Sequence, residues 1–69
     1  MFEYEFDFVI TTNFDNEYEI HGIEADNLPD AANVALEFFH DEYVLQPEER
    51  AVSVEMIHMK KIKIKDVFK

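Results

Sequence analysis

Residues 2–11, FEYEFDFVIT, decide the fold, because large apolar side chains alternate there with mostly polar ones. In an extended chain the apolar set shares one face, which carries Phe2, Tyr4, Phe6, Phe8 and Ile10. The opposite face carries Glu3, Glu5, Asp7, Val9 and Thr11. A period of two residues with many aromatic side chains is typical of a strand that buries one face. We therefore predict a first strand over residues 2–11.

A second strand is predicted to follow through a hairpin. Residues 12–16, TNFDN, are rich in turn-forming types, and an extended pattern resumes over residues 17–25. The apolar phase changes between Ile20 and Ile23, and the chain's one glycine, Gly22, lies between them. A phase change at a glycine indicates a β-bulge, in which one extra residue is inserted into the strand.

A helix is predicted to begin at Asn27, a favoured N-cap residue, with Pro29 in its first turn and Pro47 ending it. Apolar residues recur at three- and four-residue spacing and should pack inward: Leu28, Ala31, Ala32, Ala35, Leu36, Phe38, Phe39 and Tyr43. The residues expected to face water are Asp30, Asn33, Glu37, His40 and Asp41. Residues 46–50 are expected to form the loop that follows.

The stretch 51–69 contains no Gly, Pro or Asn, so nothing in it marks a turn. It is interpreted as one long, bent strand, or as two strands with a kink near residues 58–60. Nineteen extended residues would reach roughly 60 Å, well beyond an ordinary strand. We therefore expect its second half to pair with another copy of the chain, giving a homodimer through the C-terminal strand. The alternative is an edge protected by the lysines at positions 61, 63 and 65.

Together these elements predict one α+β domain over residues 1–69. Their order is β-β-α-β, with an antiparallel sheet, one helix packed on one face and a long C-terminal strand. The chain has 69 residues, no cysteine and 48% hydrophobic residues, which fits a small core without disulfides. It has no apolar run long enough to cross a membrane and an acidic start, MFEYEFD, unlike a secretory signal. A cytoplasmic protein without membrane contact is expected.

The charge is strongly acidic and unevenly distributed. Sixteen acids and six Lys or Arg give a formal net charge of −10. Residues 1–49 hold 14 acids and no Lys or Arg, which gives −14, and residues 50–69 hold six bases and two acids, which gives +4. A domain this negative repels nucleic acid and attracts basic proteins.

The usual signatures of an enzyme are missing. Without cysteine there is no thiol nucleophile, and Ser53 lies in a strand with no nucleophile elbow around it. One glycine cannot build a phosphate-binding loop. His21, His40 and His58 are scattered, and consecutive residues on a helix point in different directions, so His40 and its acidic neighbours do not converge on a metal. We expect a non-enzyme with no cofactor and no metal site.

The acidic strand face is the most informative feature. Residues two apart on a strand are about 6.6–6.8 Å apart, so Glu3, Glu5 and Asp7 should form an exposed row, at a spacing similar to that of phosphates on one nucleic-acid strand. Glu17 and Glu19 are expected beside this row. A second patch is expected on the helix, from Asp30, Glu37 and Asp41. The other acids expected to extend the negative field are Asp15, Glu24, Asp26, Glu42, Glu48 and Glu49.

A small acidic chain without catalytic residues resembles the phage-encoded inhibitors that act as DNA mimics. The segment 23–39, IEADNLPDAANVALEFF, is also similar in pattern to a strand-to-helix unit of some small anti-CRISPR proteins, and no functional residue is carried over from it. The resemblance implies an inhibitor that covers the basic nucleic-acid-binding surface of a host protein, such as a histone-like nucleoid protein, a CRISPR effector, or a restriction or repair enzyme. The alternative is a structural or regulatory assembly module whose acidity serves only solubility.

Overall fold

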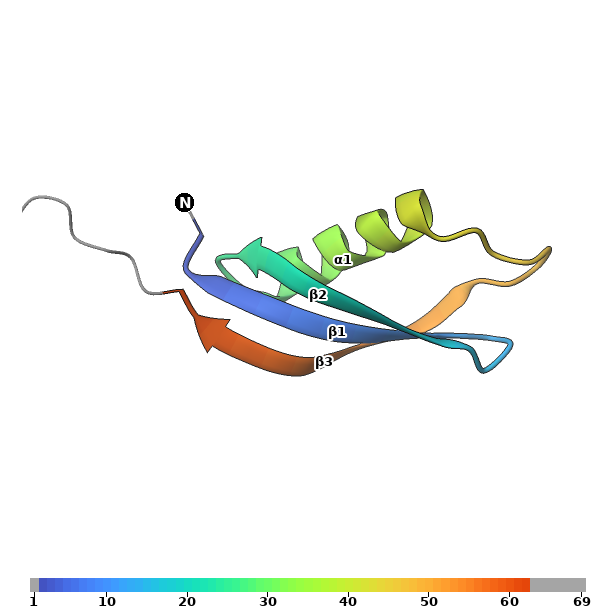
Figure 1. The fold of residues 1–69 in the computed structure, drawn as a ribbon, viewed down its shortest axis with the longest axis horizontal. Coiled ribbons are helices and arrows are strands. Elements are labelled where there is room, and N and C mark those ends of the chain that lie inside the picture. Colours follow the sequence, from blue (N-terminus) through green and yellow to red (C-terminus); the bar gives the residue numbers. More distant parts are fainter. Residues whose placement is uncertain (1, 63–69) are drawn as a thin grey trace, which may run out of the picture.

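The computed structural model describes residues 2–62, which form three strands and one helix (Figure 1). The elements are β1 (Tyr4–Thr12), β2 (Glu17–Ala25), α1 (Leu28–Glu42) and β3 (Ala51–Lys61). The strands form an open antiparallel sheet in the order β2-β1-β3, and α1 packs on one of its faces. The predicted α+β fold with β-β-α-β order is therefore confirmed.

The hairpin between β1 and β2 contains the predicted bulge. Phe6 pairs with Ile23 and Phe8 pairs with Ile20, so the two residues His21 and Gly22 stand opposite the single residue Asp7. Gly22 has a φ of 77°, in the left-handed region that favours glycine. The one glycine of the chain is therefore at the position where the strand must change phase.

Helix α1 begins as predicted and ends earlier than predicted. The side chain of Asn27 accepts a hydrogen bond from the Asp30 N–H at 2.9 Å and so caps the helix. The last helical residue is Glu42, and Tyr43 turns to extended backbone while its N–H still bonds the Phe39 carbonyl. The prediction that the helix continues up to the loop at residues 46–50 was wrong. The chain leaves the helix early, and Tyr43 and Leu45 then pack against the core.

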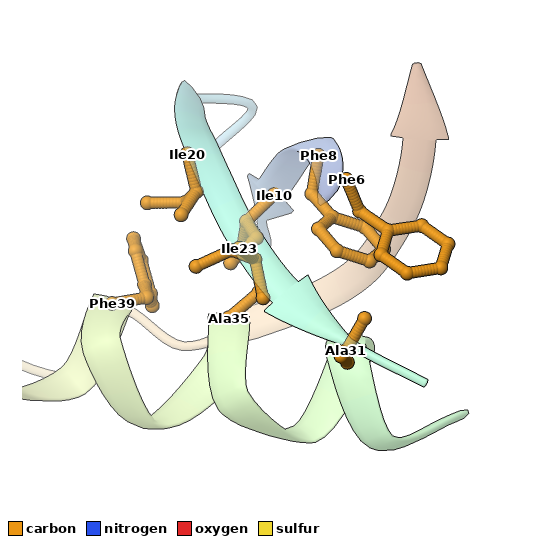
Figure 2. Close-up of a cluster of buried hydrophobic side chains, with 9 residues drawn as sticks. Phe6, Phe8, Ile10, Ile20, Ile23, Ala31, Ala35 and Phe39 are labelled. Atoms are coloured by element: carbon orange, nitrogen blue, oxygen red, sulfur yellow. The ribbon is translucent and has the colours of Figure 1, made fainter. Parts of the chain in front are cut away.

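The core lies between α1 and the sheet face that carries the aromatic alternation (Figure 2). The helix presents Ala31, Ala35 and Phe39, all with 0% exposure, at four-residue spacing. The strands contribute Phe6, Phe8, Ile10, Ile20, Ile23 and Ala25. Two members of the predicted inward stripe, Leu28 and Phe38, are 45% and 43% exposed, because the helix packs through the narrower line of Ala31, Ala35 and Phe39.

Strand β3 pairs with β1 along its whole described length, from Ala51 opposite Thr12 to Lys61 opposite Tyr4. The pairing shifts by one residue at Val52 and again at Ile57, each of which is an extra residue in β3. The second shift, at Ile57, precedes the expected kink near residues 58–60, and residues 51–61 form one strand and not two. Residues 51–61 therefore have β1 as a partner strand within the same chain. The second half of residues 51–69 was expected to pair with another copy of the chain. The expectations for residues 63–69 lie outside the described residues.

The loop after α1 is tied to the β1–β2 hairpin through one buried carboxylate, that of Glu49. Its Oε2 accepts hydrogen bonds from the Thr12 hydroxyl at 2.7 Å and the Asn16 amide at 2.8 Å, and its Oε1 accepts the Gln46 N–H at 3.0 Å. These hydrogen bonds lower the pKa of Glu49 below its ordinary value, and the bond from the Gln46 N–H has the largest effect. Glu49 therefore joins two loops, and the expectation that it extends the surface field was wrong.

Candidate acidic interaction face

Within residues 2–62 no helix lies over the sheet face opposite α1, here called the open face. Cross-strand pairing arranges its side chains in rows that run from β2 through β1 to β3. Going from one end of the sheet to the other, the rows are Glu24–Glu5–Lys60, His21–Asp7–His58, Glu19–Val9–Glu55 and Glu17–Thr11–Ser53. Six carboxylates therefore share this face with one lysine and two histidines.

The predicted row is present in part. Glu5 and Asp7 project from the central strand onto the open face, while Glu3 precedes β1 and is exposed. Glu17 and Glu19 also lie on the open face, but they pair with Thr11 and Val9 and not with the acids of β1. The hairpin register sets this offset, because a short loop over residues 13–16 places Glu17 directly opposite Thr11. Glu17 and Glu19 therefore lie further along the sheet than Glu5 and Asp7 and not directly beside them.

Asp7 is held by groups from both neighbouring strands. Its Oδ1 accepts the N–H of Gly22 at 3.0 Å, and its Oδ2 lies 3.4 Å from His21 Nδ1 and 3.8 Å from His58 Nδ1. The hydrogen bond from Gly22, supported by the one to His21, lowers the pKa of Asp7. Only 25% of its side chain is exposed. Asp7 is thus a structural anion that binds the bulge of β2 to the centre of the sheet.

His21 has two acidic neighbours on the open face. Its Nε2 lies 2.9 Å from Glu19 Oε1, and its Nδ1 contacts Asp7. The bond to Glu19, followed by that to Asp7, raises the pKa of His21 above its ordinary value. The histidines were expected to be scattered, and this was wrong for His21 and His58, which converge on Asp7. Gly22 indicated the bulge, but the register of β3 carried no sequence signal.

Glu5 also has a basic partner. Its Oε1 lies 3.7 Å from Lys60 Nζ, and it is partly buried between Lys60 on β3 and Glu24 on β2. The expectation that Glu3, Glu5 and Asp7 form one freely exposed row is therefore corrected, because two of the three are tied to neighbouring strands. Within residues 2–62, Glu17 and Glu24 form no ion pair, so the unneutralised charge of the open face lies mainly along β2.

The helix acids form a separate patch. Asp30, Glu37 and Asp41 are exposed as predicted and lie on the side of α1 that points away from the sheet. The open face lies beyond the opposite side of the sheet, so the whole two-layer thickness separates the two acidic patches (Figure 1). Asp30 also accepts a hydrogen bond from the Asn27 amide at 3.1 Å, which is part of the helix cap. The eight predicted contact residues therefore form two surfaces.

The described surface as a whole is dominated by carboxylates. Twelve acids are exposed in residues 2–62: Glu3, Asp15, Glu17, Glu19, Glu24, Asp26, Asp30, Glu37, Asp41, Glu42, Glu48 and Glu55. The exposed bases in the same range are Arg50, Lys60 and Lys61. Arg50 borders the start of β3 and the two lysines lie at its end. The hairpin and the helix thus present uncompensated negative charge, and positive charge gathers at one strand.

The described residues contain no group of three His, Asp or Glu side chains arranged to hold a metal ion. Within the same part of the chain, no helix is both long and apolar enough to cross a bilayer. Comparisons with family models, curated proteins and solved structures find no match to this chain. What the protein does is therefore inferred from its own residues and their geometry.

Proposed function

We propose that this protein is an acidic DNA mimic that occupies the basic nucleic-acid-binding surface of a host protein and so blocks DNA binding. The proposal includes a phage origin, action in the host cytoplasm and the absence of catalysis. It involves no cofactor, no membrane and no direct contact with nucleic acid. The target belongs to the class of basic DNA-binding proteins, such as nucleoid proteins, CRISPR effectors, and restriction or repair enzymes.

One observation carries this proposal: residues 2–62 expose twelve carboxylates and three Lys or Arg side chains. A surface that serves only solubility mixes both signs, because interspersed charges avoid self-repulsion. Here Glu5 and Glu24 even stand directly opposite each other on neighbouring strands, an arrangement that destabilises a sheet. A chain that keeps such repulsion on one face gains from it when a cationic partner binds there.

The geometry favours the open face over the helix as the contact surface. None of the helices and strands in the described part of the chain covers the open face, and strand β2 carries Glu17, Glu19 and Glu24 along it. Glu17 and Glu19 are two residues apart, which corresponds to about 6.6–6.8 Å on a strand. Glu5 and Asp7 hold the strands together behind this edge and add negative charge to its field. The helix acids Asp30, Glu37 and Asp41 form the second candidate surface.

The alternative is an assembly module in which acidity serves only solubility. A specific observation favours it: exposed apolar side chains gather on the edge strand β3, at Val52, Met56, Ile57 and Met59. In that case the apolar edge would carry the function and the acids would be dispensable. The two proposals are compatible only if the protein both assembles and binds a basic target.

The test of the proposal is retention of host DNA-binding proteins on the immobilised chain, followed by competition with labelled duplex DNA. We expect basic DNA-binding proteins to be retained at low salt and released at high salt, because electrostatic attraction is screened. The free chain should then displace labelled duplex DNA from the retained protein. Retention of proteins that bind no DNA, or retention that is unaffected by salt, would contradict mimicry and favour the assembly module.

A further inference from the structure

The two outer edges of the sheet differ in charge and hydrophobicity. Strand β2 carries three carboxylates and no lysine or arginine, so a second β2 would be repelled from its edge. Strand β3 carries Glu55, Lys60 and Lys61, and several of its apolar residues are exposed, with Ile57 at 49% and Met59 at 47%. An exposed apolar edge strand is a template for pairing with another strand. The β3 edge is the one suited to a partner.

We propose that β3 pairs in antiparallel fashion with β3 of a second copy, which joins the two sheets into one of six strands. In the proposed register Lys60 lies opposite Glu55 of the second copy, and Met59 lies opposite Met56 of the second copy. The inference does not depend on the proposed function. It specifies the contact surface, the partner and the residues that face each other.

The bulge at Ile57 makes this register possible. In a regular strand Glu55 and Lys60 would point to opposite faces, because they are five positions apart and side chains alternate between the faces. The extra residue puts both on the open face, since Glu55 pairs with Val9 and Lys60 pairs with Glu5.

The same shift puts Met56 and Met59 together on the face that carries the core, because they pair with Phe8 and Phe6. A twofold axis perpendicular to the sheet preserves both faces, and it forms each of these contacts twice. In each of the two pairs, both side chains therefore lie on the same face of the joined sheet.

Charge selects the second copy as the occupant. Each chain carries a formal charge of −10, so two chains repel each other except where bases are concentrated. Within residues 2–62 that place is the end of β3, at Lys60 and Lys61. Pairing there forms two Lys60–Glu55 contacts and covers four methionines. The two open faces would then lie on the same side of the joined sheet.

The experiment measures the dimer dissociation constant of the full chain by sedimentation equilibrium. We expect Glu55→Lys to weaken the dimer at least about tenfold, because two opposite-charge pairs become like-charge pairs. The double variant Glu55→Lys with Lys60→Glu should restore the constant to within about threefold of wild type, since both pairs are re-formed with reversed sign. Circular dichroism confirms that each variant is folded.

Glu24→Lys is the matched control, because it makes the same change in net charge on the distant β2 edge. It should leave the dimer at least as strong as wild type, since it reduces overall repulsion. A wild-type chain that stays monomeric at about 100 μM, some hundredfold above a micromolar constant, overturns the proposal. Equal effects of Glu55→Lys and Glu24→Lys, or a double variant as weak as Glu55→Lys, overturn the register.

Discussion

The two faces of the sheet are built on the same strands but are stabilised differently. On the face under α1, the β1 residues Phe6, Phe8 and Ile10 are almost wholly buried and their contacts are apolar. On the open face, Glu5 and Asp7 of the same strand are only partly covered and are held by hydrogen bonds and ion pairs. Burial of apolar surface contributes far more to stability than exposed ion pairs. The open face can therefore change its charges while the fold persists.

The largest expected effect comes from a cavity under the helix. Phe39→Ala should reduce the free energy of unfolding by about 3–5 kcal/mol, because the ring is fully buried against Tyr18 and the sheet. Since this approaches the total stability of a small domain, Phe39→Leu is a milder companion that should cost about 1 kcal/mol and remain folded. Urea denaturation, monitored by circular dichroism, measures the free energy of unfolding of both variants.

The neighbouring residue gives the matched control. Phe38 is 43% exposed, so Phe38→Ala should cost about 1 kcal/mol or less. Equal losses for Phe38→Ala and Phe39→Ala would show that the packing face of α1 is wrongly assigned, and so would a mild effect of Phe39→Ala.

A smaller effect is expected on the open face, as a dependence of stability on pH. The pKa of His21 is raised in the folded state, so its contribution is complete below its ordinary value of 6.5 and is lost as the pH rises through the raised value. The pKa of Asp7 is lowered, so its contribution is present above its ordinary value of 3.8 and is lost as the pH falls through the lowered value. These two groups together favour the folded state most between pH 3.8 and 6.5.

His21→Asn isolates this contribution. Thermal melts at mildly acidic and alkaline pH should show a smaller gain on acidification for the variant than for wild type. His40→Asn on α1 is the matched control, because it makes the same substitution at an exposed histidine on the other layer of the molecule. An identical pH dependence for wild type and His21→Asn would mean that the contacts of His21 with Glu19 and Asp7 contribute nothing to folding.

Much of the fold follows from local patterns. The alternation of residues 2–11, the phase change at Gly22 and the cap at Asn27 each predicted a feature that the structure contains. These signals are local, because each depends on side chains within a few residues of one another. The end of α1 was predicted less well, since no residue between Tyr43 and Gln46 forbids a helix, and the chain leaves it there as Tyr43 and Leu45 pack against the core.

The open face was harder to predict because it depends on register. The sequence identified Glu5 and Asp7 as residues of one strand face, but not that Lys60 and His58 would face them from β3. That pairing joins residues more than fifty positions apart, and the bulge at Ile57 leaves no glycine or proline as a mark. For the same reason the burial of Glu49 against the hairpin could not be foreseen.

The smallest effects on stability are expected for the carboxylates that are exposed on either surface, and their effect on binding tests the central claim. The open-face variant replaces Glu17, Glu19 and Glu24 with Gln. The helix variant replaces Glu37 and Glu42 with Gln and Asp41 with Asn. Each removes three exposed charges, so the two have equal net charge and differ only in the face affected. Both should melt close to wild type.

The most direct measurement compares these two variants in competition with labelled duplex DNA for the captured host protein. We expect the open-face variant to compete at least about tenfold less well than wild type, because the lost charges stand in for phosphates. The helix variant should compete nearly as well as wild type. Equal losses for the two variants would show that only total charge matters, and a loss confined to the helix variant would contradict the open face as the contact surface.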